Sequence, residues 1–233
     1  MPNRSSRAGI LAVLVVVCAG ALAPAAGPAS ADPAACAAGD PLRPQAELFA
    51  TDNTAVITDP GDPRLQDRLQ PFEFQVDAMV VTGMALPVGS DLLDGVFWSD
   101  TQQAVTYERS REFRLACVST PDLRAIAERV RARFAQESVL IFQPLAADDP
   151  AADAVQVEVP GLDSRRLHDV LLADADAREQ LSGGSVTEAG VGLLITERAD
   201  LETVRRTVEK SGASWSSAAV RYGTRDFVEA TGH

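Results

Sequence analysis

Hydrophobic and polar residues follow one pattern in two stretches of the chain, residues 113–143 and residues 191–223. In each stretch apolar residues first alternate with other residues, as in a strand, and then recur at steps of three and four, as in a helix. The second stretch is displaced by 78 positions, as from Ile126 to Val204, and its first strand places Leu193 where the first has Leu115. The pattern predicts a duplicated strand–helix–strand unit.

Two such units predict an α+β core over residues 111–228. The expected form is ferredoxin-like, an antiparallel or mixed sheet with its helices on one face. Residues 150–185 are expected to be an insertion that adds one strand and one helix capped by Asp163, because Asp accepts hydrogen bonds from a helix start. The alternative is a larger mixed sheet in which all the strands and an N-terminal helix share one core.

Residues 47–110 are expected to pack on this core as a strand, a kinked helix and a hairpin. The helix begins at Asp62-Pro63, and Pro71 kinks it or divides it in two. The hairpin joins residues 95–99 to 104–108, and the polar residues 109–112 mark either a bulge in one long strand or a boundary between two strands. Residues 229–233 are expected to fray.

The N-terminus has the layout of a secretory signal peptide. Arg4 and Arg7 precede an apolar run over residues 10–23, and a small-residue cleavage site lies between Ala31 and Asp32. The run is short for a membrane span, which needs about 20 apolar residues. We therefore expect a secreted protein with an extended or disordered lead-in over residues 32–46. The alternative is a protein anchored in the membrane by an uncleaved N-terminal segment.

Charge narrows the range of partners. Cleavage would remove Arg4 and Arg7, so the net charge of −12 would become −14. A surface this acidic opposes binding to nucleic acid and to anionic lipid headgroups, so neither nucleic acid nor, after signal cleavage, a membrane is an expected partner. The scarcity of lysine, with Lys210 alone, is typical of exported proteins from GC-rich bacteria.

Two cysteines, Cys36 and Cys117, remain after cleavage. An even pair outside the reducing cytosol predicts one disulfide. Closing a loop of this length would stabilise the fold by about 4–5 kcal/mol in the chain-entropy account. The alternative is that Cys117 is a small buried hydrophobe and Cys36 a free thiol.

Catalytic motifs are scarce. His168 and the terminal His233 are the two histidines, so neither HExxH nor a zinc triad can be formed, and no GxSxG motif is present. No metal site and no cofactor are predicted. An enzyme is therefore not favoured, and the alternative to a binding protein is a secreted hydrolase that uses carboxylates, with or without His168 as a base.

The hairpin and its extension hold the best candidate binding residues. Aromatic residues interleaved with arginine are the types that dominate binding hot spots. The alternative is that the aromatics are cross-strand packing partners and the charges are solvated. We expect a non-enzymatic binding or envelope-associated protein whose partner is a protein or a small ligand. The candidate residues are Trp98, Tyr107, Glu108, Arg109 and Arg111.

Overall fold

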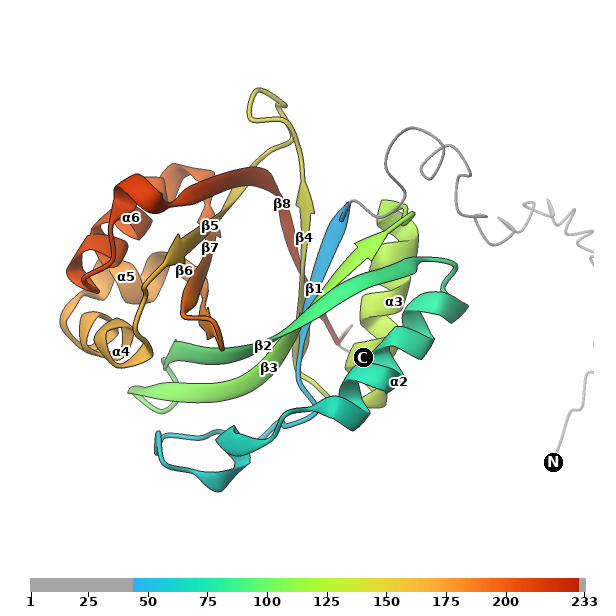
Figure 1. Ribbon diagram of the computed structural model, residues 1–233, viewed down its shortest axis with the longest axis horizontal. Helices are drawn as coiled ribbons and strands as arrows, with labels where there is room; N and C mark the ends of the chain where they lie inside the picture. Colours follow the sequence, from blue (N-terminus) through green and yellow to red (C-terminus); the bar gives the residue numbers. More distant parts are fainter. Residues whose placement is uncertain (1–43, 231–233) are drawn as a thin grey trace, which may run out of the picture.

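The computed structural model describes residues 44–230, and its eight strands close into one antiparallel barrel (Figure 1). The strands are β1 (Ala46–Ala50), β2 (Leu86–Ser99), β3 (Ala104–Ala116), β4 (Ser138–Pro144), β5 (Ala154–Pro160), β6 (Leu181–Thr187), β7 (Val191–Glu197) and β8 (Ala219–Glu229). The helices are α2 (Gln70–Thr82), α3 (Thr120–Arg133), α4 (Ser164–Ala173), α5 (Ala175–Gln180) and α6 (Leu201–Lys210), with short 3-10 turns η1 (Pro63–Gln66), η2 (Arg198–Asp200) and η3 (Trp215–Ser217).

The barrel consists of two halves with the same order of elements. The first half runs β1, α2, β2, β3, α3, β4, and the second runs β5, α4–α5, β6, β7, α6, β8. The strand order is β4-β1-β3-β2 in the first half and β8-β5-β7-β6 in the second. Pairing of β2 with β6 and of β4 with β8 joins the halves and closes the ring.

The expected ferredoxin-like sheet with helices on one face is therefore wrong, because the sheet is a closed barrel. The alternation of apolar and polar residues fixes which face of a strand is buried, but it does not say whether the outer strands of a sheet find partners. Helices α2 and α3 cover the outside of one half, and α4, α5 and α6 cover the outside of the other (Figure 1).

Each half has its own hydrophobic core between the barrel wall and its helices. In the first half, Phe72 of α2 and Ile126 of α3 pack on Leu48 and Phe113 of the wall. In the second half, Leu167 of α4 and Val204 of α6 pack on the wall. Because these cores lie outside the barrel, the inward-facing residues are free to be of a different kind.

The predicted repeat matches the helices of the two halves but not their strands. Val204 and Val208 occupy the same kind of buried position as Ile126 and Val130. Leu115, however, faces the helices, whereas Leu193 lines the barrel interior and its neighbour Leu194 faces outward. A displacement of 78 residues thus aligns the helices but is one residue out of register on the strands. A shift of one residue exchanges the two faces of a strand.

The N-terminal helix is divided in two. Asp62 caps the turn η1 by accepting from the Arg64 N–H at 2.9 Å, and α2 starts afresh with Pro71 in its first turn. The hairpin is longer than expected, and β3 is one strand that pairs with β2 through residues 109–112 without a bulge. Its polar residues 109–112 are buried on both faces of the strand. Ser110 and Glu112 face the barrel interior, and Arg109 and Arg111 contact the segment before α2.

Several predictions fall on residues outside the described part. The signal peptide, its cleavage site at Ala31 and Asp32, and the terminal residues 231–233 lie there. So does Cys36, so the Cys36–Cys117 disulfide falls partly outside the described residues and stays a prediction. Within residues 44–230, no helix is long and apolar enough to cross a membrane.

We predict that Gly223→Ala weakens the closure between β4 and β8. A methyl group at Gly223 would lie 2.2 Å from the backbone oxygen of Gln143 and 2.7 Å from the Phe142 ring. The strands would have to separate, at a cost of about 1–3 kcal/mol, which thermal denaturation would measure. Gly61→Ala, in an exposed turn, is the control, and equal melting temperatures for the two variants would contradict the prediction.

Candidate binding site inside the barrel

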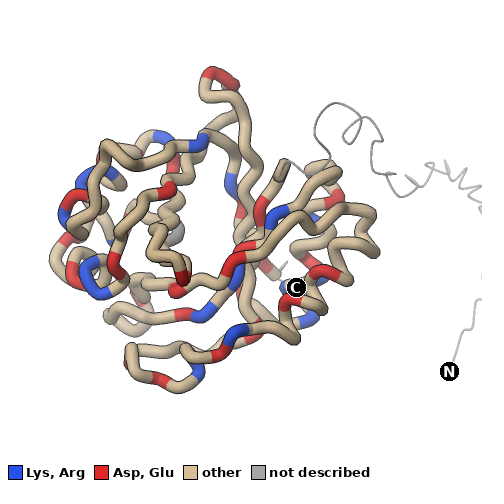
Figure 2. Tube along the Cα trace, in the orientation of Figure 1, with Lys and Arg blue, Asp and Glu red and all other residues tan. Residues whose placement is uncertain are grey.

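Strand β3 sends alternate side chains to opposite sides of the barrel wall. Glu108 and Ser110 point inward, whereas Arg109 and Arg111 point outward. Farther along the same inner face lies Glu112. The barrel interior thus receives two carboxyl groups and a hydroxyl from one strand. In the whole molecule, charged residues of both signs occur on the strands as well as on the helices (Figure 2).

A cavity of about 220 Å³ lies inside the barrel near Glu108. Most of its lining is apolar, and the polar groups are one carboxyl, one amide and three serine hydroxyls. Both halves of the chain contribute, so the cavity exists only when the barrel is closed. Its lining residues are Phe49, Ala50, Leu93, Phe97, Glu108, Ser110, Gln136, Ser138, Leu140, Ser185, Leu193, Ile195 and Phe227.

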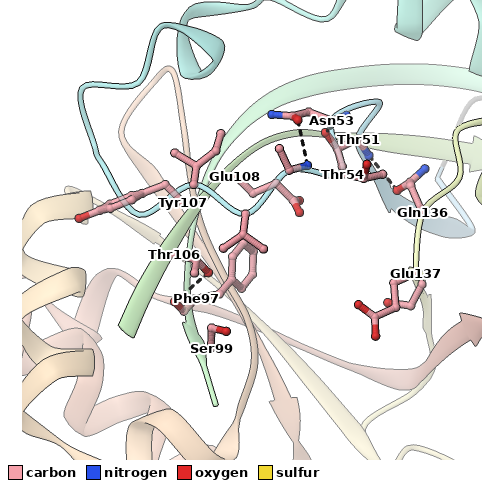
Figure 3. A pocket seen from close by; sticks show the side chains of 14 residues that line it. Thr51, Asn53, Thr54, Phe97, Ser99, Thr106, Tyr107, Glu108, Gln136 and Glu137 are labelled. Carbon is pink, nitrogen blue, oxygen red and sulfur yellow. Dashed lines mark hydrogen bonds between the residues drawn. The ribbon is translucent and has the colours of Figure 1, made fainter. Parts of the chain in front are cut away.

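A second cavity of about 260 Å³ forms the mouth of the first and shares Phe97, Glu108, Gln136 and Ser138 with it. Figure 3 shows Glu108, Phe97 and Glu137 around this space, with Tyr107 directed away from it. The segment after β1 forms its rim over residues 51–57. These cavities are small, of a size for a compact organic molecule.

Hydrogen bonds fix the rim in place. The Thr51 N–H donates to the Gln136 side chain at 3.0 Å, and the Thr51 hydroxyl donates to the Arg109 carbonyl at 2.7 Å. Farther along, the Tyr107 N–H donates to the Ile57 carbonyl at 2.8 Å. The mouth is therefore bounded by an ordered segment tied to β3 at both ends.

Burial raises the pKa of Glu108 to about 7, and a hydrogen bond with the Ser110 side chain opposes the shift. The surrounding side chains are mainly hydrocarbon, which disfavours the charged form. At neutral pH Glu108 is therefore divided between acid and carboxylate. Such a group can donate a hydrogen bond, accept one, or exchange a proton with a bound molecule.

Gly95 makes room for an aromatic ring beside this carboxyl. It lies directly across from Glu108 in the β2–β3 ladder, and a methyl group there would come within 2.3 Å of the Phe97 ring. The ring thus covers the space that a side chain at position 95 would fill. Gly95 and Phe97 together set the shape of the cavity around Glu108.

Of the residues expected to bind a partner, Glu108 lines the cavity, whereas the side chains of Trp98 and Tyr107 pack outside the barrel. The Trp98 N–H donates to Asp100 at 3.0 Å, and the Arg178 guanidinium lies 4.6 Å from the centre of its ring. Tyr107 stacks on His168 with ring centres 6.0 Å apart. His168 is therefore on the outer surface, away from the barrel interior.

Arg109 and Arg111 hold the segment before α2 against the barrel. Arg109 pairs with Asp94 and donates to the Asp67 carbonyl at 3.0 Å. Arg111 pairs with Glu73 at 2.8 Å and donates to the Arg68 carbonyl at 2.9 Å, as well as to the Ser90 hydroxyl. Both side chains are about nine-tenths buried, so neither is free to bind a partner.

Sequence reasoning missed the apolar lining of the cavity. Phe49, Leu140 and Phe227 come from strands distant in the chain, and no short motif links them. In β3 the inward-facing Glu108, Ser110 and Glu112 alternate with Arg109 and Arg111, which are polar as well. The sequence therefore carries no signal of which face of this strand lines the interior. Among residues 44–230 no set of three or more metal-ligating side chains is gathered.

Comparisons with known proteins do not assign this chain to a family. No protein family matches the sequence, and no curated protein matches it. One solved structure is similar, a chain described as "putative monooxygenase from Lactobacillus acidophilus NCFM". It is 10% identical, the match covers 80% of this chain and 96% of that one, and the TM-score is 0.25. A likeness of this degree supports no conclusion about fold or activity.

Proposed function

We propose that this is an exported protein that binds a small, mainly apolar molecule inside its barrel. The observation that carries the proposal is a cavity lined by apolar side chains from both halves around a single half-buried carboxyl, Glu108. Apolar lining with a few placed polar groups is the usual composition of a small-molecule site. Export rests on the signal-like residues 1–31 alone.

Glu108 gives the site its selectivity. A carboxyl of pKa about 7 in a hydrocarbon environment favours a ligand with one hydrogen-bonding group placed against it. An uncharged ligand that excludes water would raise the pKa of Glu108 further, because burial disfavours the carboxylate. The proposed site therefore binds an uncharged apolar ligand more tightly below pH 7 than above it.

A second candidate function, an enzyme that moves a proton, is favoured by the same group. A general base works best when its pKa lies near the working pH, and Glu108 meets that condition. His168 is on the outer surface, so a hydrolase of this kind would use Glu108 without it. Turnover of a bound compound that is lost in Glu108→Gln, with binding retained, would favour the enzyme.

We predict saturable binding of the uncharged fluorescent probe 1-aminoanthracene to the protein, with increased emission as it leaves water. Ser110→Leu should weaken binding by about tenfold or more, because the larger side chain fills the cavity. Glu108→Gln should keep the binding but remove its several-fold loss between pH 6 and pH 8, since the amide does not titrate. Fluorescence titration measures both effects.

Thr224→Val is the matched control, a small polar residue replaced by an apolar one on the outward face of β8. It should leave the probe affinity unchanged. Circular dichroism of Ser110→Leu separates a filled cavity from a damaged fold, and Glu108→Gln tests the site without adding volume. Binding that Ser110→Leu leaves intact, or the same pH dependence in Glu108→Gln, would place the probe elsewhere and refute the proposal.

A further inference from the structure

The opposite end of the barrel holds a separate and larger cavity of about 450 Å³. Four carboxyl groups line it, against two guanidinium groups. The remaining lining is a threonine and a set of aliphatic residues. The charged residues are Asp91, Glu112, Arg114, Glu158, Glu188 and Arg221, and the aliphatic residues are Leu92, Ala189, Val191 and Leu193.

Both guanidinium groups are already paired. Arg114 binds Asp91 at 2.6 Å. Arg221 pairs with Glu158 at 3.2 Å and with Glu47, which is fully buried behind the cavity. The arginines therefore have no free charge to offer an anion. Glu188 is paired with Arg68 at 2.8 Å, so Glu112 is the lining carboxyl without a close ion pair to any described residue.

Glu112 is the carboxyl of this cavity with the weakest pairing. It is 4% exposed, and no described residue forms a hydrogen bond with its carboxyl; its nearest cation, on Arg114, is 3.8 Å away. Burial first, and then the charge of Glu47, raise the pKa of Glu112 to about 8. A buried carboxyl without hydrogen bonds is costly unless a proton or a cation neutralises it.

A second orphan group lies on the same inner surface. Gln156 is fully buried, and its β-ladder partners Ile195 and Arg221 both line the interior, so its side chain points inward. A weak hydrogen bond from its amide lowers the pKa of the Glu47 carboxyl, but neither polar atom of the amide has a hydrogen bond of normal length and angle among the described residues. One oxygen of Glu47 is likewise buried without a partner. Buried polar atoms usually have a hydrogen-bond partner, so atoms that lack one indicate a site where a bound molecule could supply it.

We propose that this end of the barrel binds a small organic cation, a guanidinium or primary ammonium group on a short apolar chain. Its charge would pair with Glu112, and its N–H groups would supply hydrogen bonds to a carboxyl that has none. Its chain would lie along the inward-facing aliphatic residues Val191 and Leu193. The site is distinct from the cavity at Glu108, which lies toward the other end of the barrel, although Leu193 lines both.

Cation binding at Glu112 displaces a proton. The charged groups that face it are Glu47 on β1, Asp91 on β2, Arg114 on β3, Glu158 on β5, Glu188 before β7 and Arg221 on β8. Carboxylates outnumber guanidinium groups in this set, so the proton on Glu112 is the neutralising charge at pH 7. The affinity for a cation therefore rises with pH until Glu112 is ionised at about pH 8.

The test is isothermal titration calorimetry of the full mature protein with n-butylguanidinium, which stays charged throughout. Its uncharged isostere n-butylurea is the matched ligand. We expect binding of n-butylguanidinium with release of close to one proton at pH 7, measured in two buffers of different ionisation enthalpy. Affinity should rise by about tenfold or more from pH 6 to pH 8, and n-butylurea should bind at least about tenfold more weakly.

Glu112→Gln should reduce the affinity by about tenfold or more and abolish the proton release, whereas Glu108→Gln should change neither. Glu112→Gln keeps the shape of the side chain, so it removes the charge without changing the volume of the cavity. Equal binding of n-butylurea, no saturable binding of n-butylguanidinium, or a loss in Glu108→Gln instead of Glu112→Gln would each overturn the proposal. The 1-aminoanthracene titration tests the cavity at Glu108, and its outcome does not depend on this experiment.

Discussion

Glu112→Gln stabilises the protein at pH 8 by about 3–4 kcal/mol more than at pH 5, which corresponds to roughly 6–15 °C in melting temperature. The reason is that the folded state holds the Glu112 proton more tightly than the unfolded chain does. The pKa of Glu112 is about 8 in the folded protein against 4.5 in the unfolded chain. The amide of Gln has no such proton to lose.

The sign follows from the linkage between protonation and folding. A carboxyl whose folded-state pKa is raised adds stability that is fully present below the unfolded value, near pH 4.5, and is lost as the pH rises to about 8. Wild-type stability therefore falls across this range through Glu112, and the difference from Glu112→Gln widens with it. Glu108, with a pKa of about 7, adds a smaller loss in the same direction.

Differential scanning calorimetry of wild type and variant from pH 5 to pH 9 measures the effect. Taking the difference at each pH cancels the titration of the other carboxyls. Glu137→Gln is the matched control, because Glu137 is exposed and its replacement should stay within about 0.5 kcal/mol at every pH. A Glu112→Gln difference that does not grow with pH would show that the carboxyl is not held in its protonated form.

Phe72→Ala lowers the free energy of unfolding by about 3–5 kcal/mol. Phe72 is fully buried between α2 and the barrel wall. Its ring meets Phe113 of the wall edge-on at 5.7 Å and Phe134, at the end of α3, edge-on at 4.7 Å. The truncation leaves a cavity where three elements meet, so the lost contacts cannot be replaced by collapse of one neighbour.

Urea denaturation measures this loss as a lower midpoint with an unchanged slope. Phe74→Ala, two residues along the same helix, is the matched control because Phe74 is 73% exposed. Its replacement should change stability by no more than about 0.5 kcal/mol. Similar midpoints for the two variants would mean that α2 contributes little to the first core.

Local patterns predicted the helices well because their information is local. The caps at Asp62 and Asp163 and the helical position of Ile126 lie where the sequence indicated. The β3 strand was harder. Its residues 109–112 are polar on both faces, so the two-residue period did not distinguish a buried strand from a break.

The candidate site was predicted only in part for the same reason. The sequence selected the segment around Glu108, but it expected Trp98, Tyr107, Arg109 and Arg111 to bind a partner. Each of these is used within the protein, by stacking or by ion pairs to segments that approach from elsewhere in the chain. A side chain's availability depends on what covers it, and that is not a local property.

The sequence by itself determined the helices, most of the strands and the repetition of the strand–helix–strand unit, because spacing of apolar residues and capping act between neighbours in the chain. Only the tertiary structure decided that the sheet closes, through β2 with β6 and β4 with β8. Closure depends on pairing between strands about ninety residues apart in the chain. It also creates the interior, and thereby half-buries Glu108 and buries Glu112, which raises the pKa values of both carboxyls.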